Sequence, residues 1–184
     1  MKIADFTISK KRTFIIAEIG NNHNGSLERA KKMIDKAVEM GADCAKFQMR
    51  QIKQVYRSKS LSKSGEDLGT EYIIDLLEKF ELTVEEHKVL SDYCKKKEIL
   101  CFSSPFDESA IEFLEKFNPP AYKIASFENN HLPLIKCAAK TKKPLIISTG
   151  MATVSEIENA VNTTREQGCE DIVLLKCTST YPAS

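Results

Sequence analysis

Short apolar runs alternate with helical patterns along the chain. The apolar runs cover residues 14–19, 42–48, 99–103, 121–125, 144–148 and 172–177. Between them, apolar residues recur at helical spacing, as at Leu27, Ala30, Ile34 and Ala37. Near-continuous apolar strands separated by amphipathic helices are typical of a parallel sheet covered by helices. We therefore expect an α/β protein with six parallel strands.

Local signals predict where several of these helices begin. Thr83 with Glu86, and Thr153 with Glu156, have the spacing of a capping box, in which each residue bonds the backbone amide of the other. Residues 49–70 are polar and show no clear period, so they are interpreted as a long loop with at most a short helix.

Polar side chains gather where the predicted strands end. In a parallel sheet all carboxyl ends lie on one face, and in a (β/α)8 barrel they converge on one pocket, where the chemistry of that fold takes place. The polar residues at or near these strand ends are Glu18, Lys46, Gln48, Ser103, Ser104, Lys123, Ser126, Glu128, Ser148, Lys176, Thr178 and Ser179.

Lys46 and Lys123 are the most informative of these residues. Each lies inside an apolar strand pattern, where burial of an ammonium group is costly without oxygen partners. Lysines beside hydroxyls and loop amides suit a compact anion such as phosphate or a carboxylate. The simpler alternatives are an internal ion pair between Glu18 and Lys46, and helix capping by the serines.

The composition argues against several classes of protein. The 184 residues hold 27 Lys and Arg against 26 Asp and Glu, a net charge of +1, which argues against a nucleic-acid-binding surface. No apolar run reaches the ~20 residues of a membrane helix, and the N-terminus lacks a signal-peptide core, so we expect a cytoplasmic protein.

The cysteines and histidines suggest no metal site. We interpret the six cysteines as reduced, because they form no CxxC pair and several lie in apolar patterns. The three histidines lack metal-ligand spacing. His87 is predicted to lie on the surface of a helix, whereas His23 falls in the loop after the first strand.

Six ordered motifs resemble the nonulosonic (sialic-type) acid synthases, which include N-acetylneuraminate, legionaminate and pseudaminate synthases. The motifs are IAEIGNNHNG, AKFQ, FSSPFD, YKIASFE, ISTGMAT and LLKCTSTYP, and the resemblance covers residues 14–182. It implies a (β/α)8 TIM-type barrel, represented here only through about the sixth strand. Residues 1–184 would then be an incomplete barrel domain, lacking the last strands and a C-terminal antifreeze-like domain.

The resemblance also implies a reaction. Enzymes of this family condense phosphoenolpyruvate with an N-acetylated amino-sugar aldehyde to a nine-carbon 2-keto acid and release phosphate. A divalent metal ion, Mn or Mg, polarises the sugar carbonyl, and its ligands are expected beyond residue 184, so no metal ligand is expected within the chain. The full-length form would be a homodimer.

The family roles can be carried over to matching positions. Glu18 and Glu128 would be catalytic, Glu18 in proton traffic at the sugar hydroxyls and Glu128 at carbon 2 or its attacking water. Substrate would be held by Lys46, Gln48, Ser104, Lys123, Ser126, Ser148 and Tyr181, with Gln48 and Tyr181 facing the sugar. The chain departs from the family pattern at Ser179, where asparagine is usual, while Phe127 and Lys176 favour the pseudaminate branch.

Two other functions fit the same sequence. One is a fragment that binds an anion or pairs with another chain without catalysis, because six strands of an eight-stranded barrel leave two sheet edges exposed. The other is a related phosphoenolpyruvate-dependent aldose condensation that makes an eight-carbon acid. The sequence leaves the acceptor sugar open.

Overall fold

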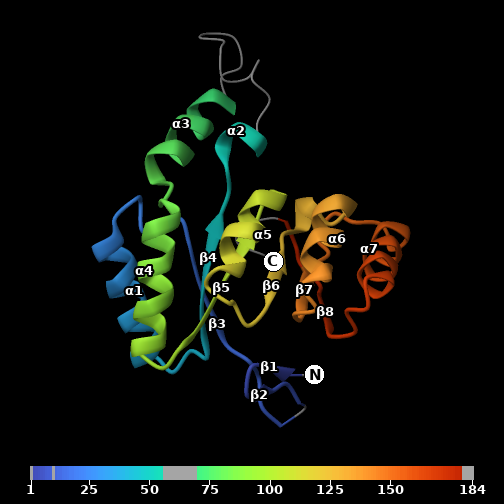
Figure 1. Cartoon of the computed structure of the whole chain (residues 1–184), viewed down its shortest axis with the longest axis horizontal. Helices are drawn as coiled ribbons and strands as arrows, with labels where there is room; N and C mark the ends of the chain where they lie inside the picture. The colour runs from blue at the N-terminus through green and yellow to red at the C-terminus, as the bar shows by residue number, and fades with distance from the viewer. Residues whose placement is uncertain (1, 10, 56–69, 180–184) are drawn as a thin grey trace. The chain divides into compact units, whose positions relative to one another are not determined.

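The computed structural model describes residues 2–9, 11–55 and 70–179 (Figure 1). The chain divides into two compact units. One consists of Ile15–Cys101, and the other of Met1–Phe14 together with Phe102–Ser184. We describe each unit separately.

The Ile15–Cys101 unit is built on parallel strands β3 (Ile16–Gly20) and β4 (Cys44–Met49), which pair with Glu18 opposite Lys46. The strand β5 (Leu100–Pro105) follows β4 in the same sheet and continues past the unit's last residue. The helices of the unit are α1 (Leu27–Glu39), α2 (Ile52–Val55), α3 (Thr70–Phe80) and α4 (Val84–Lys96).

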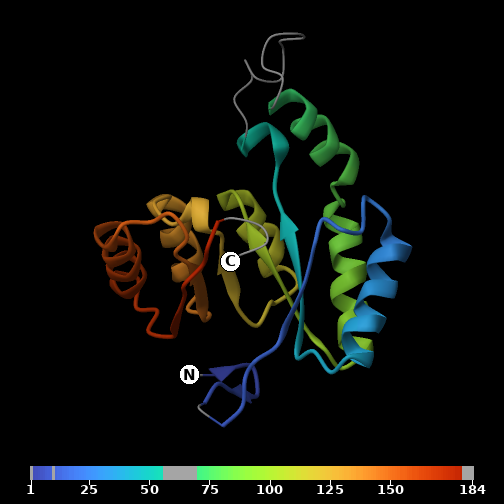
Figure 2. The ribbon, with the colours of Figure 1, turned by 180° about the vertical axis from the view of Figure 1, so that it is seen from behind.

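The core of this unit lies between its sheet and two helices. Ile34 of α1, Leu90 of α4 and Phe47 of β4 are almost fully buried and belong to one apolar cluster. Figure 2 shows α1 and α4 side by side. The cluster fixes the orientation of β3 and β4, and with it the direction in which their polar ends point.

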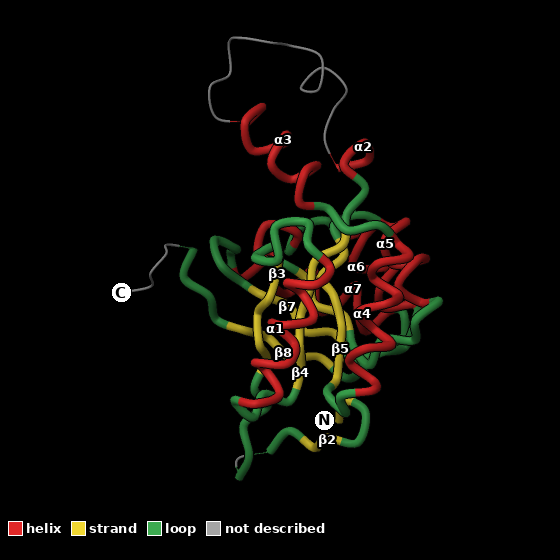
Figure 3. Tube along the Cα trace, turned by 90° about the vertical axis from the view of Figure 1, so that its left-hand side faces the viewer, coloured by secondary structure: helices red, strands yellow, loops and turns green. Residues whose placement is uncertain are grey.

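The second unit contains the parallel sheet β6–β7–β8, with β7 in the centre. Figure 3 shows two of its strands, β7 and β8. Its strands are β6 (Tyr122–Ile124), β7 (Leu145–Ser148) and β8 (Ile172–Leu175), and its helices are α5 (Glu108–Glu115), α6 (Leu132–Lys140) and α7 (Val154–Glu166), with a 3₁₀ turn η1 (Ser126–Glu128) after β6. A two-stranded antiparallel ribbon, β1 (Lys2–Ile3) with β2 (Phe6–Thr7), belongs to the same unit.

The predicted order of strands and helices is confirmed, with strand ends shifted by one or two residues. Both capping boxes are present, at Thr83 with Glu86 and at Thr153 with Glu156. The helix α3 and the β1–β2 ribbon were not predicted from the sequence. No helix in the described segments is long and apolar enough to cross a membrane.

The prediction that His87 lies on the surface is wrong. Only 6% of His87 is exposed, and its ring packs edge-on against Phe47 with the centroids 6.5 Å apart. The helix α4 turns this position toward the sheet, along with Leu90 and Cys94. Burial, together with the nearby His23, lowers the pKa of His87 to about 4, although Glu86 acts in the opposite direction.

We predict that His87 makes the chain less stable in mild acid. Because its pKa is about 4 in the folded chain and 6.5 when exposed, the unfolded chain takes up the proton first as the pH falls. Between pH 7 and pH 5 this costs about 2 kcal/mol of unfolding free energy, which urea denaturation at the two pH values measures. The His87→Leu variant should lose that part of the pH dependence. If the unfolding free energy falls equally from pH 7 to pH 5 in the unchanged chain and in His87→Leu, then His87 is not the cause of the acid sensitivity.

Candidate functional site

A buried lysine lies at the centre of the polar residues that follow β6, β7 and β8. The Lys123 ammonium donates to the Ile124 carbonyl at 2.9 Å and to the Ser148 hydroxyl. The Cys177 thiol also donates to the Ser148 hydroxyl oxygen, at 3.3 Å. Lys123 and Ser148 are only 9% and 5% exposed.

The strand register explains why these residues meet. Lys123 lies opposite Ile146, and Ser148, the last residue of β7, lies opposite Leu175 at the end of β8. Because the strands are parallel, the residues after each strand leave the sheet at the same edge. Lys123, Ser126 and Ser148, which were predicted at or near strand ends, lie in one cluster in the structure.

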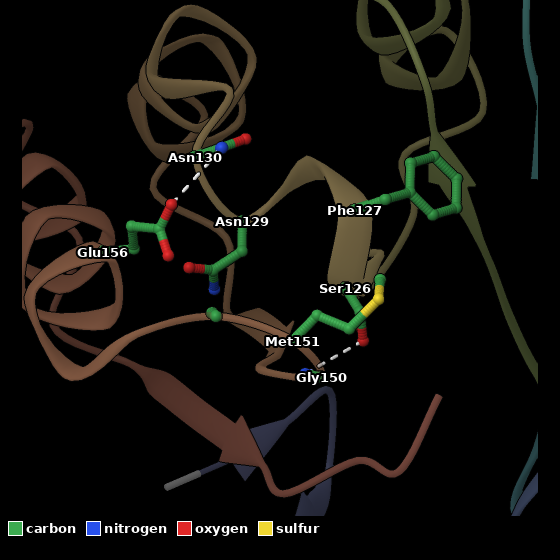
Figure 4. A pocket seen from close by; sticks show the side chains of 8 residues that line it. Ser126, Phe127, Asn129, Asn130, Gly150, Met151 and Glu156 are labelled. Atoms are coloured by element: carbon green, nitrogen blue, oxygen red, sulfur yellow. Dashed lines mark hydrogen bonds between the residues drawn. The ribbon is translucent and has the colours of Figure 1, made fainter. Parts of the chain in front are cut away.

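Gly150, which follows β7, lies beside Ser126, which follows β6 (Figure 4). Its amide donates to the Ser126 hydroxyl at 3.1 Å. A Cβ atom at this position would lie 2.6 Å from Oγ of Ser179 and 2.9 Å from Oγ of Ser126, closer than a real Cβ atom allows. Glycine at this position therefore lets the hydroxyls of Ser126 and Ser179 approach the backbone. We call Lys123, Ser126, Ser148, Gly150 and Ser179 the lysine–serine cluster.

A pocket of about 150 Å³ adjoins this cluster, between η1 and the start of α7 (Figure 4). Asn129, which lines it, is 2% exposed and donates from Nδ2 to the Ser148 carbonyl at 3.2 Å. Its Oδ1 atom is buried and has no hydrogen-bond partner among the described residues. Asn129 was not predicted as a site residue, because in the sequence a polar residue directly after Glu128 looks like any other loop residue.

Glu128 is paired with a histidine that the sequence analysis did not single out. Oε2 of Glu128 lies 2.7 Å from Nδ1 of His131. The carboxylate side chain is 11% exposed, whereas the histidine side chain is 38% exposed. Glu128 and His131 are three residues apart across the end of η1, which brings their side chains together. The His131 amide also donates to the Glu128 carbonyl. The imidazole therefore fixes one oxygen of a nearly buried carboxylate.

A second polar cluster forms in the other unit, at the carboxyl ends of β3 and β4. Nζ of Lys46 lies 2.6 Å from Oε2 of Glu18, with the lysine side chain 6% and the glutamate side chain 55% exposed. Gln48 accepts a hydrogen bond from Arg50. A Cβ atom on Gly20 would lie 3.3 Å from Glu18 and 3.5 Å from Gln48, so all three residues meet at this strand end.

The ion pair between Glu18 and Lys46 is the simpler alternative that the sequence left open, and it is present. It provides Lys46 with an anionic partner inside the protein. Ser104 is buried in β5, at 2% exposure. Tyr181 lies outside the described residues. No group of three or more His, Cys, Asp or Glu side chains within the described segments could hold a metal ion.

Alternating strands and helices, with polar clusters at the carboxyl ends of parallel strands, place the chain in the class of (β/α)8 barrels. A model of the NeuB family matches residues 33–184, and the chain belongs to that family. Six strands of the barrel lie within the described residues.

The similarity to related proteins extends over nearly the whole chain. It is 40% identical to the spore coat polysaccharide biosynthesis protein SpsE of Bacillus subtilis, with 99% of the chain and 49% of that protein covered. It is 41% identical to a pseudaminic acid synthase of Campylobacter jejuni, with 100% of the chain and 54% of that protein covered. The chain thus spans about half the length of the curated relatives it matches.

The structure is similar to solved structures of the same family. It superimposes on an N-acetylneuraminic acid synthetase from Leptospira borgpetersenii with a TM-score of 0.82 at 33% identity, covering 93% of this chain and 56% of that one. This agrees with the predicted family and fold.

We predict that Gly150→Ala destabilises the second unit and distorts the lysine–serine cluster. The added methyl group must push aside two serine oxygens, which for an overpacked site costs about 1–3 kcal/mol of unfolding free energy. Urea denaturation measures this loss. Adding Ser179→Ala removes the nearer oxygen and should restore part of the stability, with Ser179→Ala alone as the control. If Gly150→Ala and the double variant Gly150→Ala, Ser179→Ala are equally unstable, the steric explanation is wrong.

Proposed function

We propose that the chain carries the phosphoenolpyruvate-binding part of a nonulosonic acid synthase. The reaction joins phosphoenolpyruvate to an N-acetylated amino-sugar aldehyde, giving a nine-carbon 2-keto acid and phosphate. The observation that carries this proposal is the lysine–serine cluster at the carboxyl edge of β6–β8, in a chain of the NeuB family.

The cluster has the donors that a phosphate or carboxylate requires. The Lys123 ammonium supplies positive charge from inside the sheet, and the hydroxyls of Ser126, Ser148 and Ser179 can turn their protons toward an anion. Burial strengthens such bonds because water does not screen them. Ser104, in β5, is proposed as a further donor.

Lys46 would contribute differently, because Glu18 already holds it. An incoming carboxylate would share the Lys46 ammonium with Glu18, and Glu18 could then accept a proton from a sugar hydroxyl. Gln48, beside Glu18, is proposed to bind the sugar, as is Tyr181. Glu18 at 55% exposure is accessible to such a substrate.

Glu128 is proposed to act at carbon 2 of phosphoenolpyruvate. In the reaction, carbon 3 of the enol attacks the aldehyde carbon, whose oxygen takes up a proton, and carbon 2 becomes electron-poor. Water adds to carbon 2, and cleavage of the bond between carbon 2 and the phosphate oxygen leaves the keto group and free phosphate. A nearly buried carboxylate such as Glu128 stabilises the positive charge or takes the proton of the water.

The described residues offer no group of three metal ligands, and the family's divalent metal ion is proposed to take its ligands from beyond residue 184. The acceptor is proposed to be a 2-acetamido sugar, in keeping with relatives named as synthases of pseudaminic, diacetyllegionaminic and N-acetylneuraminic acids. The complete enzyme is proposed to be a cytoplasmic homodimer.

We predict that Lys123→Met weakens phosphoenolpyruvate binding to this chain about tenfold or more. Loss of a charge-assisted hydrogen bond typically costs about 1.5–3 kcal/mol, and a buried site has no solvent to replace it. Titration calorimetry measures the dissociation constant. The control is Lys140→Met, which removes the same charge from the exposed last residue of α6. If Lys123→Met and Lys140→Met bind phosphoenolpyruvate with equal affinity, Lys123 is not part of the binding site.

Turnover is tested separately, by incubating a full-length version of the protein with phosphoenolpyruvate, Mn²⁺ and a series of 2-acetamido sugars. The proposal expects phosphate release together with a product of nine-carbon mass. An eight-carbon product would identify the related aldose condensation instead. Binding of phosphoenolpyruvate without turnover of any sugar would favour the anion-binding alternative.

A further inference from the structure

The two oxygen atoms of the Glu128 carboxylate have different surroundings. Oε2 lies 2.7 Å from Nδ1 of His131, and no other described residue is hydrogen-bonded to the carboxylate. The side chain is only 11% exposed, so solvent has limited access to it. Oε2 is therefore held by the protein, and Oε1 is the oxygen that can still accept a hydrogen bond or a proton.

The place of His131 at the start of α6 does not account for its side chain. His131 is the N-cap residue of α6, a position where serine, threonine, aspartate and asparagine are preferred because their side chains bond the free amides of the first turn. The His131 side chain makes no such bond. Its ring bonds Glu128 instead, so helix capping does not explain the histidine.

Backbone hydrogen bonds hold His131 on both sides. The His131 amide donates to the Glu128 carbonyl at 3.0 Å, which closes the turn between the two residues. The His131 carbonyl accepts from the Ile135 amide at 3.1 Å, in the first turn of α6. Because the backbone is already ordered by these bonds, bringing the ring to Glu128 costs little further conformational entropy. Both residues belong to the unit that contains the lysine–serine cluster.

The chemistry of the two groups determines where the proton of the imidazole lies. An ionised carboxylate can only accept hydrogen bonds, so Nδ1 carries the proton and donates to Oε2. In a neutral imidazole, Nε2 is then without a proton. Nε2 has no hydrogen-bond partner among the described residues, and the histidine side chain is 38% exposed. The pair thus has one defined arrangement, with the carboxylate inside and the histidine toward solvent.

We propose that His131 is the positioning residue for Glu128: it holds Oε2 and thereby presents Oε1 to carbon 2 of phosphoenolpyruvate and to the attacking water. This inference rests on the proposed function. Orientation matters because a displacement of about 1 Å in an active site can cost about a hundredfold in rate. In this role His131 contacts neither substrate and acts through Glu128 alone.

The proton balance of the step leaves the histidine unchanged. When the water oxygen bonds to carbon 2, Oε1 takes one proton of the water, while Oε2 continues to accept from Nδ1. When the bond between carbon 2 and the phosphate oxygen breaks, that proton leaves with the phosphate. The second proton of the water offsets the one that the aldehyde oxygen takes up. Glu128 ends the cycle ionised and still bonded to His131.

The ring nitrogens of His131 test the pairing without any turnover. NMR of the isotope-labelled intact chain, in alkaline buffer where the ring is neutral, should show the proton on Nδ1 and a bare Nε2. Glu128→Gln should weaken this preference, because the charged acceptor is lost. A proton on Nε2 of His131 in the unchanged chain would overturn the proposal.

Two variants that both suit a helix N-cap separate positioning from capping. His131→Asn places an amide near the position of Nδ1 and can donate to Oε2, whereas the side chain of His131→Ser is too short to reach it. In a full-length version of the protein, we expect His131→Ser to lower kcat about tenfold or more, with the KM for phosphoenolpyruvate nearly unchanged. His131→Asn should restore most of that loss.

Stability is the control, and both variants should unfold at the same urea concentration because both residues cap α6. Equal kcat in His131→Ser and the unchanged protein would overturn this inference and leave the proposed function in place. A loss that His131→Asn does not restore, or a change in KM alone, would also overturn it. No phosphate release by the unchanged full-length protein with any sugar would overturn the proposed function, and this inference with it.

Discussion

An ammonium group inside a parallel sheet must reach oxygen atoms, and this requirement organises the carboxyl edge of β6–β8. Lys123 lies in the middle of β6, and its ammonium group is buried. It donates to the Ser148 hydroxyl, at the end of β7, and to the Ile124 carbonyl. Gly150 keeps the neighbouring space open for the hydroxyls of Ser126 and Ser179.

The two buried lysines are held in different ways, and the difference bears on their roles. Lys46 is bonded to the carboxylate of Glu18, while Lys123 is bonded to a hydroxyl and a carbonyl. A carboxylate partner is bonded to Lys46, so an added anion must compete with Glu18. The hydroxyls of Ser126 and Ser148 in the cluster around Lys123 can donate to an anion. For this reason the proposed phosphate contacts centre on Lys123.

Much of the fold could be predicted from local patterns, because strand runs and capping boxes depend on neighbouring residues alone. Lys123, Ser126 and Ser148 could be found because their strands share a direction. The burial of His87 could not be predicted from the sequence, since it depends on how α4 packs against Phe47. The pairing of Glu128 with His131 was missed for a similar reason: a 3₁₀ turn, invisible in the hydrophobic pattern, brings them together.

Amide NMR of the chain during titration with phosphoenolpyruvate tests whether the lysine–serine cluster is the anion site. We predict saturable shifts at Gly150 and at the serines after β6, β7 and β8, because the Gly150 amide is bonded to the Ser126 hydroxyl. Shifts confined to other parts of the chain, or none at saturating ligand, would mean that the anion binds elsewhere or not at all.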